Sequence, residues 1–186
     1  RADTLNEDYI KVFDEARKKG MCRFVGVSLH KNHVEVLDAA VESRFWEAAL
    51  TTYNYMSPPS LQQAIERTRK AGLAIIAMKS LAKGKGYPDH KMGDITPNQA
   101  ALKWVLEDPY VDTVIPGMTS FEHLTEDLAV MGMRMSFSDS RKLMRYAESL
   151  EGKYCRGVAG CTGCKDQCPK GVEISELNRC IGYAYG

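Results

Sequence analysis

The cysteines near the end of the chain have types and spacings that suit metal chemistry. Five of the six cysteines lie between Tyr154 and Cys180, and a Cys-x-x-Cys step joins Cys161 to Cys164. That step sets two thiolates one tight turn apart, and glycines before each of them ease the backbone around a small inorganic group. A proline, Pro169, follows the fourth cysteine of the run. Such a Cys-Pro step is typical of bacterial loops that hold a [4Fe–4S] cluster.

The spacing also indicates which cysteines bind the cluster. The gaps between the first four are five, two and three residues, whereas the usual run is Cys-x2-Cys-x2-Cys-x3-Cys. The first ligand, Cys155, therefore lies further from the other three than in the usual run, and Cys180 is held in reserve as its substitute. Two other interpretations stay open, a zinc site and disulfides, although zinc usually takes two Cys-x-x-Cys pairs and disulfides need an oxidising compartment. The expected ligands are Cys155, Cys161, Cys164 and Cys168.

Length and charge set limits on the class of protein. The 186 residues suit one domain over residues 1–150 and a cysteine-rich tail over residues 151–186. A formal net charge of +1 indicates neither a nucleic acid partner nor an anionic membrane surface. No apolar run approaches the ~20 residues that a membrane span needs. We expect a cytoplasmic protein, because reduced thiolates suit a reducing compartment.

Hydrophobic periodicity predicts alternating helices and strands. The pattern carries no hairpin signal, so it predicts parallel strands joined by helical crossovers. A glycine-rich dinucleotide turn is missing after the first strand, which favours half of a (β/α)8 barrel with its functional residues at the strand ends. The predicted strands cover residues 22–29, 45–53, 73–78 and 111–115, and the predicted helices cover 6–20, 34–43, 61–71, 96–106, 121–131, 138–150 and, in the tail, 174–184.

Short motifs stand at the ends of these strands. They are Phe24-Val-Gly-Val-Ser28, Tyr53-Asn54, Ile76-Ala-Met-Lys-Ser-Leu81 and Val114-Ile-Pro-Gly117, and Ser120-Phe-Glu-His-Leu-Thr-Glu-Asp127 follows the last. In order and interval over residues 6–131 they resemble the second half of an aldo/keto reductase. The resemblance implies an α/β fold, the C-terminal half (four β/α units) of a TIM-type (β/α)8 barrel. The cysteine-rich C-terminal appendage resembles that of a sub-group with a ferredoxin-type [4Fe–4S] motif.

The resemblance implies a nicotinamide cofactor, NAD(P)H, across the barrel mouth. Ser28 is expected to hydrogen-bond the carboxamide, and Met78 takes the place of the aromatic ring that usually stacks on the nicotinamide. Gly117 and His123 replace the basic pair that binds the 2′-phosphate in many members, so the choice between NAD and NADP stays open. Lys79 and Leu81 are expected along the pyrophosphate, and Gly117, Met118, Thr119, His123, Glu126 and Asp127 along the adenosine end.

The family's catalytic groups have no counterpart in this chain. In the family, a tyrosine acid works with lysine, aspartate and histidine, and all four come from the first half of the barrel. Tyr53 and Tyr55 lie on the wrong strand for the acid, so no catalytic residue is expected here. The chain is then the cofactor-side portion of an oxidoreductase. Its expected partners are the missing N-terminal half of the barrel, which would cover two open sheet edges, a small carbonyl substrate and a redox partner.

Other functions fit parts of the same sequence. The chain is alternatively a non-enzymatic iron–sulfur module for electron transfer or assembly, or a zinc-stabilised binding module. Lys79, after an apolar strand, is a candidate for a Schiff-base lyase if it is desolvated. His30 and His33 have no third ligand nearby, so we expect surface or capping histidines.

Overall fold

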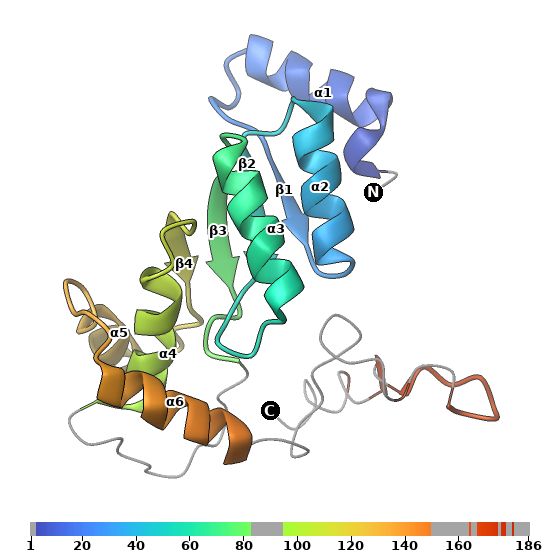
Figure 1. Cartoon of the computed structure of the whole chain (residues 1–186). Helices are drawn as coiled ribbons and strands as arrows, with labels where there is room; N and C mark the ends of the chain where they lie inside the picture. Colours follow the sequence, from blue (N-terminus) through green and yellow to red (C-terminus); the bar gives the residue numbers. More distant parts are fainter. Residues whose placement is uncertain are drawn as a thin grey trace.

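One parallel sheet organises the described part of the protein. The computed structural model describes residues 3–82, 95–149 and 167–174, together with Cys164, Glu176, Leu177 and Cys180. Within them, four parallel strands pair in chain order, which confirms the prediction (Figure 1). The strands are β1 (Gly26–Leu29), β2 (Ala48–Thr52), β3 (Ala74–Met78) and β4 (Thr113–Ile115).

Each strand begins later than its hydrophobic pattern predicted. Just before β1, the backbone N–H of Val25 donates to a side-chain oxygen of Glu47 at 3.0 Å, and the Val25 carbonyl accepts from the Glu47 N–H at 2.9 Å. The regular ladder between β1 and β2 starts at the next residue, with the pair formed by Gly26 and Ala48.

Helices follow the strands in regular alternation, and short polar side chains start several of them. Asn6 accepts hydrogen bonds from two N–H groups of α1, and Thr96 and Gln99 form a reciprocal capping box at α4. These bonds satisfy N–H groups that a helix start leaves without partners. The helices are α1 (Glu7–Lys18), α2 (His33–Ser43), α3 (Pro59–Lys70), α4 (Pro97–Leu106), α5 (Phe121–Leu128) and α6 (Phe137–Ser149), preceded by a 3-10 turn, η1 (Asp3–Leu5).

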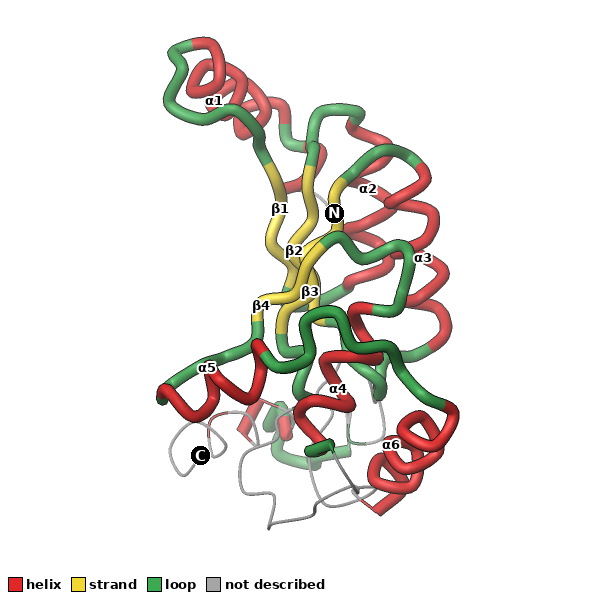
Figure 2. Tube along the Cα trace, turned by 90° about the vertical axis from the view of Figure 1, so that its left-hand side faces the viewer, coloured by secondary structure: helices red, strands yellow, loops and turns green. Residues whose placement is uncertain are grey.

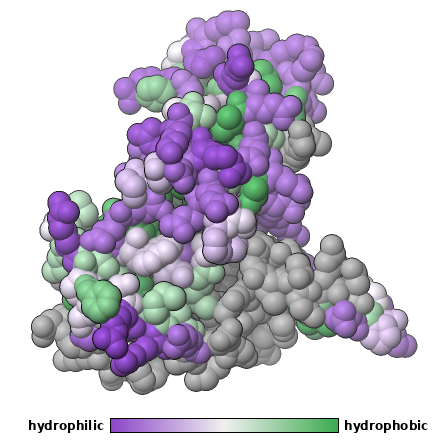
Figure 3. All heavy atoms as spheres, in the orientation of Figure 1, coloured by the Kyte–Doolittle hydropathy of each residue, from purple (hydrophilic) through white to green (hydrophobic). Residues whose placement is uncertain are grey.

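The main core lies between the sheet and two of these helices. Figure 2 shows α2 and α3 on one side of the sheet, and their apolar side chains Leu37 and Ile65 are completely buried there. The strand residues that face them alternate along the chain, as the two-residue period of a strand requires. Figure 3 shows that the outer surface of this layer is mostly hydrophilic. Trp46 is buried and Trp104 packs partly buried against the core, so both tryptophans are core residues.

The other face of the sheet lacks this cover. Ser28 pairs with Leu50, and Leu50 pairs with Ile76, so these side chains form one row on a single face. Figure 2 shows none of the described helices across the middle of that face. The row occupies the position of the interior of a closed barrel, so the sheet has the architecture of half a barrel.

Part of the tail lies outside the described residues. The boundary at residue 150 and most of the helix predicted over residues 174–184 fall there, so both stay predictions. In the described part of the chain, no helix is both long enough and apolar enough to cross a bilayer.

Candidate functional site

The carboxyl ends of the four strands bring the predicted cofactor residues to one edge of the sheet. Ser28 lies near the end of β1 and is exposed, and Met78 ends β3 with only 8% of its surface exposed. Both occupy the uncovered face, because Ser28 pairs with Leu50, and Met78 pairs with Thr52 two residues further along β2.

The turn after β3 is strained and firmly held. Lys79 and Ala82 adopt positive φ angles of 53° and 49°, a region that side chains other than glycine rarely enter. The Lys79 carbonyl accepts hydrogen bonds from Asn54 Nδ2 at 3.0 Å and from the Ala82 N–H at 3.1 Å. The turn also buries the Ser80 hydroxyl, which has no hydrogen-bond partner among the described residues. Strained turns of this kind persist where the surroundings hold them and are common at functional sites.

The Lys79 side chain does not meet the conditions for Schiff-base chemistry. It is exposed to solvent rather than enclosed by apolar groups. A lysine amine becomes a nucleophile at neutral pH when burial disfavours its ammonium form. The exposed side chain is instead available to a phosphate group at the same edge.

The segment between β4 and α5 has open space beside Gly117. Further along, side chains of the same segment contact each other. A Cβ added to Gly117 meets no atom within 4 Å among the described residues. Ser120 caps α5 by accepting a hydrogen bond from the His123 N–H, and the His123 ring nitrogen Nδ1 lies 3.2 Å from Thr119 Oγ1. His123 is therefore held by its own loop, and no atom of the described residues fills the space beside Gly117.

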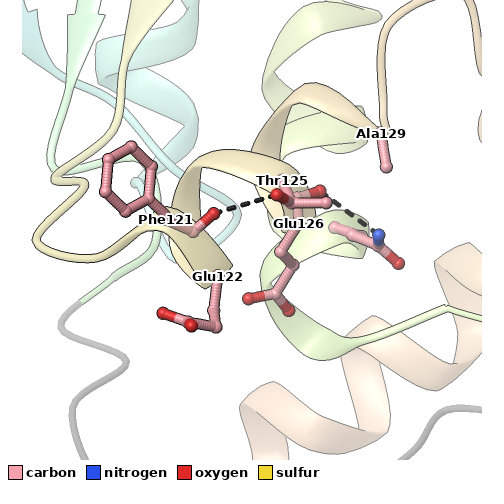
Figure 4. A pocket seen from close by; sticks show the side chains of 6 residues that line it. Phe121, Glu122, Thr125, Glu126 and Ala129 are labelled. Carbon is pink, nitrogen blue, oxygen red and sulfur yellow. Dashed lines mark hydrogen bonds between the residues drawn. The ribbon is translucent and has the colours of Figure 1, made fainter.

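Glu126 has a structural role as well as the predicted one. Its carboxylate accepts hydrogen bonds from Thr96 Oγ1 and from Asn98 Nδ2, and its carbonyl accepts one from Gln99 Nε2. These bonds join α5 to the first turn of α4. Figure 4 shows the residues along α5 that line an open cavity of about 480 Å³ beside this contact. A ligand that binds through the Glu126 carboxylate has to share it with α4.

Asp127 is the neighbouring acid, and it is buried without a complete set of partners. Only 4% of it is exposed, and its Oδ2 has no hydrogen-bond partner among the described residues. Burial, and then the charge of Glu126, raise the pKa of Asp127, while His123 acts in the opposite direction. An unpaired buried carboxyl is costly.

His33 corrects the expectation of a surface or capping histidine. It is 6% exposed, and its Nδ1 lies 3.0 Å from Thr51 Oγ1 in the core. Burial, followed by the charges of Lys79 and His30, lowers the pKa of His33. The alternation of strand residues 49, 51 and 53 is the sequence signal for this contact, because it places Thr51 on the helix-covered face.

Tyr53 makes a structural contact. Its hydroxyl donates to Asp108 Oδ2 at 2.5 Å, and the side chain is completely buried on the helix side of the sheet. Burial, together with the Asp108 carboxylate, raises the pKa of Tyr53. Sequence analysis missed this pair, because Asp108 follows α4 and carries no local signal for a contact with β2.

Only part of the predicted metal site can be located. Cys155 and Cys161 lie outside the described residues, and Cys164 and Cys168 are both half-buried free thiols. Backbone turns bend the chain after each, with the Gln167 N–H donating to the Cys164 carbonyl at 3.3 Å and the Gly171 N–H to the Cys168 carbonyl at 3.0 Å. No group of three or more metal-binding side chains comes together among the described residues, where two of the four expected ligands are not included.

Comparison with known proteins supports the aldo/keto reductase resemblance. No protein-family model matches the chain. Among curated proteins, methylglyoxal reductase DkgB of Escherichia coli O157:H7 is 24% identical over 144 residues, and its counterpart in Salmonella typhi is 25% identical over the same length. Both alignments cover 74% of this chain and 52% of the relative, so the chain spans about half the length of the curated relatives it matches.

Solved structures share the fold at low sequence identity. The holo form of an aldo-keto reductase from Bacillus halodurans matches with a TM-score of 0.60 and 14% identity, over 73% of this chain and 54% of that one. An aldo-keto reductase from Klebsiella pneumoniae in complex with NADPH matches with a TM-score of 0.56 and 20% identity, over 74% and 52%. The described fold is thus that of about half an aldo-keto reductase barrel.

Proposed function

We propose that this chain is the cofactor-side portion of an NAD(P)-dependent oxidoreductase of the aldo/keto reductase kind. One observation carries the proposal: residues matching the family's cofactor motifs lie together at the carboxyl edge of a half-barrel sheet. Ser28 and Met78 occupy its uncovered face, and Lys79 follows at the same edge. The relatives' names, and the cofactor named for the Klebsiella protein, support this proposal.

The residues present fit a dinucleotide in one further respect. An added Cβ at Gly117 would meet no described atom within 4 Å, so this position leaves room for a ribose. When bound, the nicotinamide would supply a hydride, and the residues of this chain would bind and orient it. Ser28 would hold the carboxamide, Lys79 and Leu81 the pyrophosphate, and Met118, Thr119, His123, Glu126 and Asp127 the adenosine end. With no lysine or arginine between residues 116 and 133, the ribose subsite carries no fixed positive charge for a 2′-phosphate.

Exposed apolar surfaces support the missing half of the barrel as the partner of this chain. In the described part of the chain, no residue of helix α1 is buried. Its apolar side chains Tyr9 and Val12 are 51% and 64% exposed. On α5, Phe121 and Leu128 are 84% and 53% exposed. The two helices belong to opposite ends of the sheet order, next to its two open edges. A second half-barrel that paired with both edges would cover the helices and the uncovered face.

If the barrel is made of this chain and a second half, we assign no catalytic residue to this chain. The family's acid and its three assisting groups would come from the partner half, together with the rest of the site for a small carbonyl substrate. The non-enzymatic iron–sulfur module is kept as the second candidate, because the family's four catalytic groups are expected to come from the first half of the barrel. Carbonyl-dependent oxidation of the reduced cofactor by the completed barrel would support the enzyme and contradict the module.

We propose further that the tail binds one [4Fe–4S] cluster through Cys155, Cys161, Cys164 and Cys168. The donor set supports it: four thiolates match the ligands of such a cluster, and turns bend the described chain at Cys164 and Cys168. A reducing compartment such as the cytoplasm would keep these thiols available. The cluster would serve a redox partner if its potential allows electron transfer.

Cofactor binding is tested by titrating the chain with NADH and NADPH and following tryptophan fluorescence. Substituting Ser28→Ala removes one hydrogen bond to the cofactor, worth about 0.5–1.5 kcal/mol, so the dissociation constant should rise about two- to tenfold. Ser60→Ala is the matched control, because Ser60 is an exposed serine on the outer helix α3. Equal affinities for the two variants, or no binding at millimolar cofactor, would contradict the proposal.

The cluster is tested by anaerobic purification with iron, sulfide and zinc analysis. Cys164→Ser and Cys168→Ser should each lose the brown colour and most of the bound iron. Cys22→Ser is the control, because Cys22 packs against the core near Trp46, far from the tail in sequence. Zinc in place of iron would instead identify a zinc-stabilised module.

A further inference from the structure

A side-chain amide joins the segments that follow β2 and β3. One residue after the end of β2, the backbone N–H of Tyr53 donates to the Met78 carbonyl at 3.1 Å. At the next residue a side chain continues the pairing, because Nδ2 of Asn54 donates to the Lys79 carbonyl at 3.0 Å. Asn54 therefore connects the loop before α3 to the turn at the predicted cofactor edge.

Asn54 is itself fixed by its own loop. Its Oδ1 accepts from the Met56 N–H at 3.0 Å, and its backbone N–H donates to Ser57 Oγ at 3.0 Å. Its carbonyl accepts from the Ser57 N–H at 2.8 Å, and only 9% of the residue is exposed. The bond from Met56 also assigns the two ends of the amide, since a backbone N–H needs an oxygen as its acceptor. The nitrogen at the other end of this planar group is thereby directed at the Lys79 carbonyl.

The carbonyl that Asn54 binds belongs to a residue in an unfavourable conformation. Lys79 has a φ angle of 53°, in the left-handed region where a Cβ crowds the backbone. A residue stays in such a conformation only when its surroundings hold it. The Ala82 N–H holds the Lys79 carbonyl from within the turn, at 3.1 Å. The bond from Asn54 comes from another loop, so it also fixes where the turn lies relative to the sheet.

We propose that Asn54 is a positioning residue for the cofactor edge. Its amide holds the turn after β3 in the strained form and so sets the place of the exposed Lys79 side chain beside Met78. Asn54 acts through the turn rather than by contact with a cofactor, because it is buried and both ends of its amide are engaged. A turn that is already held in its binding conformation lowers the ordering cost of binding. The hold on the turn stands on these hydrogen bonds, and its meaning for the cofactor rests on the proposed function.

The hold on the turn is tested by hydrogen exchange of the Ala82 amide, which donates to the Lys79 carbonyl. Asn54→Ala removes the bond from the other loop and should speed this exchange by about two- to tenfold. Asn54→Asp is a second variant of nearly the same shape. It keeps an oxygen for the Met56 N–H but has no N–H for the Lys79 carbonyl, so it should also speed the exchange by about twofold or more.

Ser57→Ala is the matched control, because it removes a different hydrogen bond of Asn54 and leaves both donors to the Lys79 carbonyl. Exchange at Ala82 should then stay within about twofold of the wild-type rate. A rescue separates positioning from a general loss of stability. Lys79→Gly added to Asn54→Ala should slow the exchange again, because glycine adopts positive φ angles without steric cost. Equal exchange in Asn54→Ala and Ser57→Ala, or no slowing on addition of the glycine, would overturn the hold on the turn.

A second arm separates this inference from the proposed function. In a titration followed by tryptophan fluorescence, the affinity for NADH should fall about two- to tenfold in Asn54→Ala and stay within about twofold of the wild type in Ser57→Ala. If NADH does not bind to the wild-type chain at all, the proposed function fails, while exchange at Ala82 still decides the hold on the turn. If NADH binds equally well to both variants although their exchange differs, the role of Asn54 at the cofactor edge is refuted.

Discussion

The contact that attaches α6, the last helix before the tail, can be tested by removing one charge. Lys103 on α4 lies 2.8 Å from Asp139 on α6, and the two side chains are 5% and 14% exposed. Replacing Lys103 by Met keeps the length of the apolar stem but leaves a nearly buried carboxylate without its cation. Removing one partner of a buried ion pair typically costs about 3–5 kcal/mol. Asp139 keeps a hydrogen bond from the Ser136 N–H at 3.1 Å, so we expect the lower end, about 3 kcal/mol.

Urea unfolding measures this cost, with the midpoint and slope compared among variants. The double variant Lys103→Met with Asp139→Asn removes both charges and keeps an oxygen for Ser136, so it should lose only about 1 kcal/mol. Lys18→Met, which removes an exposed lysine paired with Asp14, is the control and should stay within about 1 kcal/mol of the wild type. A cost below about 1 kcal/mol for Lys103→Met, or an equal cost for the double variant, would refute the reasoning.

The same pair predicts a dependence on pH. Burial alone would raise the pKa of Asp139, but the bonds from Lys103 and Ser136 outweigh it and hold the pKa below its usual value. A lowered carboxyl pKa contributes stability that is complete above the unfolded value of about 3.9 and is lost as pH falls through the folded value. The advantage of the wild type over the Lys103→Met and Asp139→Asn double variant should therefore shrink below about pH 4. An advantage that persists unchanged to pH 2 would contradict this.

Three further predictions concern single side chains. Tyr53→Phe should cost about 1.5–3 kcal/mol in urea unfolding, because it removes the hydroxyl that donates to Asp108, and a cost under about 0.5 kcal/mol would contradict that bond. Gly26→Ala should cost about 1–3 kcal/mol, since its Cβ would lie 2.8 Å from the Ala48 carbonyl oxygen; a variant as stable as the wild type would show that β1 shifts freely. Asp127→Asn should stabilise the chain at pH 7, because the pKa of Asp127 is raised and its ionised form is disfavoured in the fold; the gain should fall as pH drops through that pKa, and a loss of stability at pH 7 would contradict it.

Local signals in the sequence were sufficient for the order of elements and the direction of the strands. The cap at Ser120 and the Thr96-Pro97 start act within a few residues, so the corresponding helices begin at Phe121 and Pro97. The lack of hairpin signals left parallel pairing as the consistent arrangement, and the four strands pair in that way. The family motifs likewise lie at strand ends because those ends are set by the same local pattern.

Contacts between distant residues were decided by the tertiary structure alone. The pairs His33 with Thr51 and Lys31 with Glu176 join elements that the chain separates by many residues. The two-residue period of a strand places Thr51 on the helix-covered face, but which side chain meets it there depends on how the helices pack on the sheet. The same holds for burial. Asp127 and Glu126 are adjacent acids in one helix, yet among the described residues Asp127 Oδ2 has no hydrogen-bond partner, whereas Glu126 is joined to α4 because it leaves the helix axis in another direction. The sequence by itself thus predicted the order of the elements and the candidate residues at the strand ends, and packing determined which of the described side chains are buried and which are exposed.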